Sequence, residues 1–248
     1  MKVQKAPGDH TRRAADAALR CIAYGAMAKA FAYPKPGTRT DLLEMLESVQ
    51  PDAAVLGESA AEACAAAIEA LRRLRDAELE AEYLAIFTHV CSADCNPCET
   101  SYLCKHLFQV SQSLAELSGF YRAFGVEPNG ERADHFSVEL EFLSYLVYRE
   151  AGEEMRGEEE RAEESRQARR LFFERHIGRW FKTLLFLVRR KAGQGPYHAI
   201  AEFCEALLSS DAALLDAPAA ERTHIGDLPL PVWEVDAPRA RQRREQAR

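Results

Sequence analysis

The stretch "DHFSVELEFLSYLVYREA", residues Asp134–Ala151, decides the fold class. Its apolar residues Phe136, Leu140, Leu143 and Val147 are spaced by four, three and four positions. This spacing places them on one face of an α-helix and does not fit the two-residue alternation of a strand. Asp134 stands where a helix N-cap is expected, so the sequence predicts a helix over Phe136–Ala151 that Asp134 caps.

The same periodicity recurs through most of the chain, whereas strand alternation and internal repeats do not. It predicts an all-α, single-domain helical bundle over residues 1–210, followed by an extended segment and a flexible basic tail over residues 211–248. The charge run Arg149–Glu164 is predicted to be a solvated connector or a helix extension. The other predicted helices are Arg12–Tyr33, Thr40–Val49, Ser59–Thr88 with a break near Asp76, Glu99–Phe124, Arg166–Lys191 and Tyr197–Leu208.

The composition excludes several classes of protein. The chain has 248 residues, of which 47% are hydrophobic and 29% charged, which is typical of a globular protein. Its formal net charge of −7 argues against general nucleic-acid binding. No apolar run is long enough to span a membrane.

The segment Thr11–Ala30 superficially resembles a twin-arginine signal. Asp16 and Arg20 interrupt its apolar run, so it is predicted to be a buried first helix of a cytoplasmic protein with reduced thiols.

Four of the seven cysteines lie close together in the chain, at Cys91, Cys95, Cys98 and Cys104. Short-spaced cysteines are typical of zinc sites and also of iron–sulfur clusters. Cys104 also fits a small buried apolar residue on a helix. Metal binding, redox chemistry and inert thiols are therefore three interpretations, of which inert thiols without a bound cofactor is preferred. A zinc or iron–sulfur protein with a sensing or redox role is the alternative function.

Six motifs in a fixed order carry a resemblance to a known family. They are "YLAIF" (83–87), "NPCETSY" (96–102), "FYRAFGVEP" (120–128), "DHFSVELEFL" (134–143), "FFERHIGRWFKTLLFLV" (172–188) and "PYHAIAEFCEALL" (196–208). With these motifs the chain resembles the TorD/DmsD/NarJ family of molybdoenzyme assembly chaperones between Leu19 and Leu208. Within that family it looks most like members serving respiratory enzymes of the dimethyl-sulfoxide-reductase superfamily, which includes a type II branch.

The resemblance implies a TorD/DmsD-like helical fold without enzymatic activity. It also implies a cytoplasmic chaperone of anaerobic respiration that binds the catalytic subunit of a molybdopterin oxidoreductase, through its twin-arginine signal peptide, its body or both. The chaperone would hold this client until its cofactor is inserted and export begins. Neither nucleic acid nor stable membrane insertion is expected, and the chain has no phosphate-binding loop for ATP.

The residues expected to contact the client follow from the same motifs. Asp134 and His135 match the family's Asp-His pair, although an N-cap and its packed neighbour would use the same residue types. Carboxylates suit the guanidinium groups of a twin-arginine peptide, and aromatic side chains suit its apolar part. Glu139 and Glu141 are two positions apart on a helix and therefore point in different directions. The predicted client-binding residues are Asp134, His135, Glu139, Glu99, Tyr102 and Tyr121.

Overall fold

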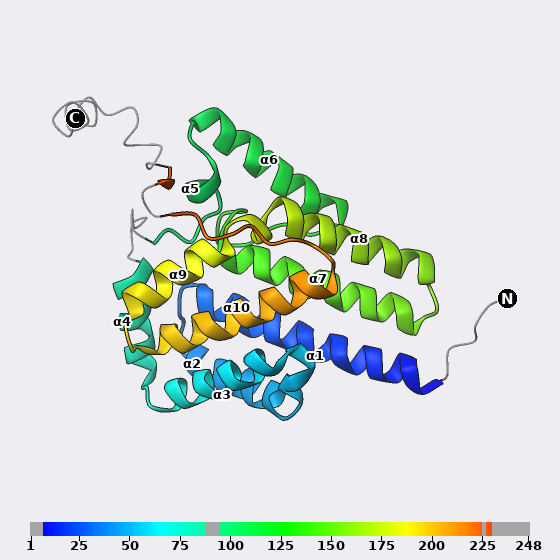
Figure 1. The fold of residues 1–248 in the computed structure, drawn as a ribbon, viewed down its shortest axis with the longest axis horizontal. Coiled ribbons are helices and arrows are strands. Elements are labelled where there is room, and N and C mark those ends of the chain that lie inside the picture. The colour runs from blue at the N-terminus through cyan, green and yellow to red at the C-terminus, as the bar shows by residue number, and fades with distance from the viewer. Residues whose placement is uncertain (1–6, 88–94, 225–226, 230–248) are drawn as a thin grey trace.

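The computed structural model describes residues 7–87, 95–224 and 227–229 of the chain. Within these residues it contains ten α-helices and two short 3-10 helices (Figure 1). The described parts contain no strand, and their β-structure is limited to one isolated bridge between Cys98 and His135. The predicted all-α, single-domain helical bundle is confirmed.

The helices follow one another through short connections. Gly37, with a φ of 87°, precedes α2 in a left-handed conformation that glycine adopts at low cost. Pro196 begins α10, where the missing N–H of proline removes no hydrogen bond. The elements are α1 (Pro7–Phe31), α2 (Thr38–Val49), η1 (Gln50–Leu56), α3 (Glu58–Arg72), α4 (Asp76–Phe87), α5 (Thr100–Leu103), α6 (Leu107–Ala123), α7 (Phe136–Met155), α8 (Glu159–Arg175), η2 (Ile177–Arg179), α9 (Phe181–Ala192) and α10 (Pro196–Leu214).

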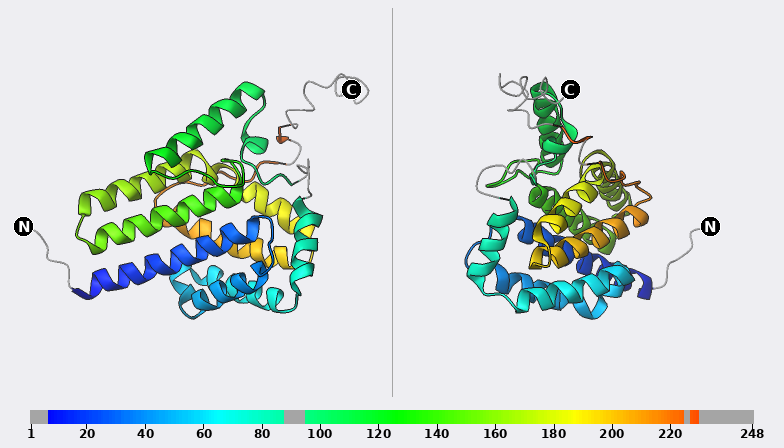
Figure 2. Two further views of the ribbon diagram at one scale, coloured as in Figure 1. Left: turned by 180° about the vertical axis from the view of Figure 1, so that it is seen from behind. Right: turned by 60° about the vertical axis from the view of Figure 1, so that its left-hand side comes forward.

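The long helices α1 and α7 form the centre of the bundle. They run antiparallel, because the ring of Phe31 at the end of α1 meets Phe136 at the start of α7 at a centroid distance of 4.9 Å. Helix α8 lies on the other side of α7, and α10 packs on α3 and α9 (Figures 1 and 2). Helix α6 lies at the edge of this arrangement (Figure 2).

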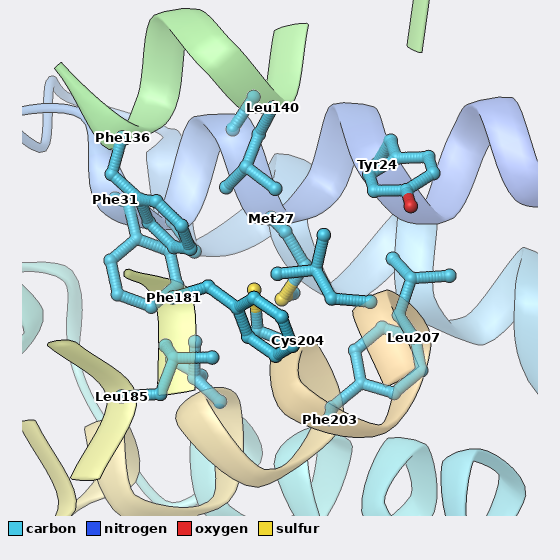
Figure 3. Packing of buried hydrophobic residues seen from close by; sticks show 14 of the residues in the cluster. Tyr24, Met27, Phe31, Phe136, Leu140, Phe181, Leu185, Phe203, Cys204 and Leu207 are labelled. Carbon is cyan, nitrogen blue, oxygen red and sulfur yellow. The ribbon is translucent and has the colours of Figure 1, made fainter. Parts of the chain in front are cut away.

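The hydrophobic core lies where four helices meet (Figure 3). Phe31 of α1, Phe136 of α7, Phe181 of α9 and Phe203 of α10 are all buried. These side chains come from segments up to 172 positions apart, so the core closes only when both ends of the bundle have assembled. Burial of large apolar side chains is the main contribution to the stability of such a domain.

The predicted continuous helix Glu99–Phe124 is wrong, because the chain leaves the helical conformation at Cys104. Cys104 is extended, and His106 then caps α6 together with Gln109, whose side chain accepts a hydrogen bond from the His106 N–H at 3.2 Å. The break lets α5 turn the Tyr102 side chain into the core. Leu107, which the periodicity places on a buried stripe, is instead 61% exposed.

The predicted helix Arg166–Lys191 is also wrong as a single element. Helix α8 ends at Arg175, and α9 begins at Phe181 after the short helix η2. His176 and Trp180, which flank η2, both leave the α-helical conformation, and both side chains are buried. The break therefore turns two polar aromatic side chains towards the interior.

The charge run Arg149–Glu164 is a helix extension on both sides of a tight turn. Helix α7 continues to Met155, and α8 starts at Glu159. The run is only partly solvated, because the buried Glu153 accepts hydrogen bonds from Arg149 at 2.7 Å and from Ser165 at 2.6 Å.

The predicted boundary at residue 210 falls inside α10, which ends at Leu214. The chain then packs across α9. Ala220 donates its backbone N–H to the carbonyl of Gly178 at 2.8 Å, and Thr223 donates to the hydroxyl of Thr183 at 3.0 Å. Thr88 of the predicted helix Ser59–Thr88 lies outside the described residues, as do residues 225–226 and 230–248 of the predicted extended segment and tail. Of the helices that the structure describes, none has the length and apolar character to cross a membrane.

Candidate functional site

Two loops that are distant in sequence are hydrogen-bonded to each other beside the start of α7. The N–H of Glu99 donates to the carbonyl of Asp134 at 2.9 Å, and the N–H of Phe136 donates to the carbonyl of Pro97 at 2.7 Å. The pairing joins the motif "NPCETSY" to the motif "DHFSVELEFL". We call the cluster of buried side chains around it the polar junction; it consists of Glu99, Asp134, His135, Glu139, His176 and Trp180.

Asp134 caps a different helix from the one predicted. Its buried carboxylate accepts hydrogen bonds from the backbone N–H of Thr100 at 3.2 Å and from the Thr100 hydroxyl at 2.6 Å. Arg132 is a further partner of this carboxylate. The Nε of Arg132 donates a hydrogen bond to Oδ1 of Asp134 at 3.0 Å. Asp134 thus holds the start of α5, and the prediction that it caps the helix beginning at Phe136 is wrong. The N-cap of α7 is His135.

His135 is buried as a neutral imidazole. Its Nδ1 accepts a hydrogen bond from the N–H of Ser137 at 3.3 Å and lies 2.7 Å from the Ser137 hydroxyl. Burial lowers the pKa of His135, because a charged ring loses its hydration, and the nearby charges of Glu131 and Asp134 oppose this effect. An Nδ1 that accepts leaves the ring proton on Nε2.

Glu99 is paired with His176 inside the protein. Oε2 of Glu99 lies 3.1 Å from Nδ1 of His176, and both side chains are buried. Nε2 of His176 has no hydrogen-bond partner among the described residues. The tautomer with its ring proton on Nδ1 fits these contacts, because this N–H donates a hydrogen bond to Glu99. Nε2 then carries no proton, so no buried donor of His176 is left unpaired.

Glu139 is fully buried beside this pair. Trp180 donates its indole N–H to Oε2 at 3.2 Å, whereas Oε1 receives no hydrogen bond from a described residue. Burial raises the pKa of Glu139 well above its usual range, and the charges of Glu99 and Asp134 raise it further. The junction therefore favours the neutral acid form of Glu139.

Two tyrosines enclose the polar junction. Tyr102 stacks on Trp180 with a ring-centroid distance of 5.1 Å and an interplanar angle of 28°. Tyr121 donates its hydroxyl to the carbonyl of Ala133 at 2.7 Å and packs edge-on against Phe142. Burial raises the pKa of both hydroxyls. Both rings therefore act as core residues that fix the loops around Asp134.

The structure brings all six predicted client-binding residues into one region. None of the six side chains is more than 8% exposed. In this conformation they fix the positions of α5, α7 and η2, and direct contact with a client stays a prediction. Glu139 is buried and Glu141 exposed, so the prediction that these two residues point in different directions is confirmed.

Sequence reasoning assigned no site role to His176 or Trp180. The available signal was the presence of two polar aromatic residues on an otherwise apolar stripe, in the segment "FFERHIGRWF". It also missed Thr100 and Arg132, which are the hydrogen-bond partners of Asp134. Nothing in the periodicity of either loop indicates that these residues meet.

The cysteine-rich stretch is partly described. Cys95, Cys98 and Cys104 are buried, and Cys91 lies outside the described residues. Burial raises the pKa of the Cys104 thiol, and the charge of Glu99 adds to this effect. A raised pKa disfavours the thiolate that binds metals. Across residues 7–87, 95–224 and 227–229, no three His, Cys, Asp or Glu side chains gather in a way that would hold a metal ion.

An exposed apolar surface begins four positions after the end of α5. Leu107 and Phe108 are 61% and 77% exposed, and we call this pair the α6 tip. The break at Cys104–His106 separates these residues from α5, whose start is held by Asp134 of the buried polar junction.

Comparison with known proteins identifies one family. A sequence profile of the nitrate reductase delta subunit matches residues 53–185, which is more than half of the 248-residue chain. The matched range contains every residue of the polar junction and the α6 tip. No curated protein sequence matches the chain.

Proposed function

This chain belongs to the nitrate reductase delta subunit family, a family of molybdoenzyme assembly chaperones, and we propose that it serves the catalytic subunit of one molybdopterin oxidoreductase in the cytoplasm. The observation that carries the proposal is that the family match includes the whole polar junction. The chain would hold the subunit during cofactor insertion and delay its export.

Binding without catalysis fits the chemistry of the polar junction. Its hydrogen-bonding groups are buried and mostly satisfied by one another, as with Asp134 and Thr100. A catalytic group must reach a substrate, whereas these groups hold α5 and α7 in place. We infer that the junction is the scaffold of the chaperone and that client contact takes place on the surface beside it.

The α6 tip is the surface that we propose for the body of the client. An unfinished catalytic subunit exposes apolar surface that must be kept from aggregating, and Leu107 and Phe108 offer apolar side chains to it. The arginines of the signal peptide need carboxylates. Glu131 is an exposed carboxylate three positions before Asp134, and the net charge of −7 attracts a cationic peptide.

A pull-down from the native cytoplasm tests the proposal. The tagged full chain is purified while the respiratory enzyme is being made, and co-purifying proteins are identified by mass spectrometry. We expect an unprocessed molybdopterin oxidoreductase catalytic subunit. Phe108→Asp should reduce its recovery, whereas Tyr148→Asp should not, because Tyr148 is 67% exposed on α7, away from the α6 tip.

Variants of the junction add a second comparison. Substitution of Asp134 or His135 should weaken capture, but these residues also hold the fold together, so thermal unfolding is measured in parallel. Loss of capture by Phe108→Asp with unchanged thermal stability supports direct contact. Absence of any molybdoenzyme subunit from the wild-type eluate contradicts the proposed function itself.

A further inference from the structure

The chain that follows α10 crosses α9 and reaches α5. The guanidinium of Arg222 lies over the ring of Phe186, 4.0 Å from its centroid, and Leu228 packs partly buried against the hydrophobic core. Residues 227–229, at the red end of the colour scale, lie beside α5 and close to the start of α6 in all three views (Figures 1 and 2). The described chain therefore ends next to the α6 tip.

The α6 tip is an apolar surface with area left to cover. Leu107 is 61% exposed and Phe108 is 77% exposed, whereas Leu117 further along the same helix is fully buried. Neighbouring exposed apolar side chains mark a surface that another segment or a partner contacts. Covering them would remove apolar area from water, which is favourable in proportion to that area.

The residues directly after Pro229 have the composition that such a surface binds. They read "LPVWEV" (230–235), which is apolar except for one glutamate. Trp233 has the largest apolar side chain of this run and is four positions beyond Pro229. An extended chain spans up to about 13 Å over four residues, so Trp233 is within reach of a surface next to α5. Pro231 favours such an extended chain over a helix.

A basic run follows the apolar one. Residues 239–248 contain five arginines and one glutamate, so they contribute +4 to the formal net charge of −7, and residues 1–238 carry −11. The negative body of the protein therefore attracts this run. Arginines beside apolar side chains are also the groups that a twin-arginine signal peptide would present. The segment thus offers the chemistry of the proposed ligand.

We propose that residues 230–235 fold back on the α6 tip of the same chain and cover it while no client is bound. Trp233 packs on Phe108 and Leu107, and the client displaces it. A displaceable cover is weak; one that occupies the tip in about half of the molecules lowers the apparent affinity for a client by about twofold. The inference rests on the proposed function and deepens it, because it names what regulates access to the surface that the client uses.

Quenching of Trp233 fluorescence by acrylamide tests the contact in the full chain without any client. The only other tryptophan, Trp180, is buried, and Trp233→Phe supplies its signal for subtraction. Phe108→Asp should raise the quenching constant of Trp233 by about twofold, because it releases the segment from the tip. Tyr148→Asp, which changes an exposed side chain of α7, should leave the quenching constant unchanged.

The pull-down of the proposed client tests the regulation. Trp233→Asp should raise the recovery of the catalytic subunit by about twofold, because the tip is then open in all molecules. Ala237→Asp, which adds the same charge outside the apolar run, should leave the recovery unchanged. Lower recovery with Trp233→Asp would mean that the segment binds the client, and this result overturns the proposal.

Two fluorescence results also overturn it. Equal quenching of Trp233 in the wild type and in Phe108→Asp would show that the segment does not lie on the tip. Protection of Trp233 that increases with protein concentration would assign the tip to a second copy of the chain. Neither measurement needs a client, so these results leave the proposed function intact, whereas an eluate without any molybdoenzyme subunit contradicts the proposed function and leaves the contact standing.

Discussion

Trp180 donates its indole N–H to the buried carboxyl of Glu139 at 3.2 Å, although 41 positions separate the two residues. The contact ties the break between α8 and α9 to the first turns of α7. Trp180 also stacks on Tyr102, so the same side chain holds α5. One indole therefore connects the three segments that the polar junction joins.

The first prediction concerns the proton on Glu139. The raised pKa of Glu139 means that the folded state binds this proton more tightly than the unfolded chain. Its contribution to stability is complete below the ordinary pKa of glutamic acid, about 4.3, and is lost as the pH rises through the raised folded pKa. Glu139→Gln replaces the neutral acid by a neutral amide of similar shape.

We therefore expect the stability of the wild type to fall relative to Glu139→Gln as the pH increases above about 4.3. Urea unfolding of both proteins at a series of pH values measures the difference. A difference that stays constant with pH would show that Glu139 titrates alike in the folded and unfolded states.

The second prediction concerns the cap of α5. Asp134→Ala removes the acceptor of the Thr100 N–H and hydroxyl and leaves Arg132 without its carboxylate. A cost of about 2–3 kcal/mol in unfolding free energy is expected, as for hydrogen bonds to a charged group. A double-mutant cycle with Thr100→Val, measured by urea unfolding, should give a coupling energy of about 1 kcal/mol or more. Strictly additive effects would mean that the hydrogen bond between the two side chains contributes nothing.

Periodicity predicted the helices but not the breaks that build the site. The helix beginning at Phe136 was placed correctly, because its apolar residues face α1 and the core. The break after Leu103 contains neither glycine nor proline, and the break after Arg175 contains one glycine, Gly178, which a helical pattern tolerates, so local signals did not show either break. Tertiary contacts impose them instead, since His176 reaches Glu99 and Trp180 reaches Glu139 only when the helix is interrupted.

The residues of the candidate site were predictable only in part, because their partners lie in distant segments of the chain. Asp134 and Glu99 were predicted as site residues because they lie in motifs that resemble those of a known family. Their partners come from other segments, and a single sequence contains no signal that Glu99 meets His176 across 77 positions. It also contains no signal that distinguishes a buried carboxylate from an exposed one when both follow a loop.

The third prediction concerns the close packing at η2. A Cβ added at Gly178 would lie 2.5 Å from the carbonyl oxygen of Phe173 and 2.7 Å from its ring. The backbone must shift to relieve this contact, so Gly178→Ala should destabilise the protein by roughly 1–3 kcal/mol. Gly119→Ala is the control, because nothing lies within 4 Å of the added atom and alanine favours the helix α6. Urea unfolding should show opposite signs for the two variants, and equal effects would contradict the packing at Gly178.

The fourth prediction concerns the two sides of α6. Leu117 is fully buried, whereas Phe108 is 77% exposed on the same helix. Leu117→Ala should cost about 2–5 kcal/mol through the cavity that it leaves, and Phe108→Ala should change the unfolding free energy by no more than about 0.5 kcal/mol. A cost at Phe108 that approaches the cost at Leu117 would mean that the α6 tip packs against the protein in solution, which would leave no apolar surface there for a client. We expect that Phe108→Ala leaves the unfolding free energy nearly unchanged and that Phe108→Asp loses the client in the pull-down. These two results together would show that the Phe108 side chain contributes to client binding and not to folding.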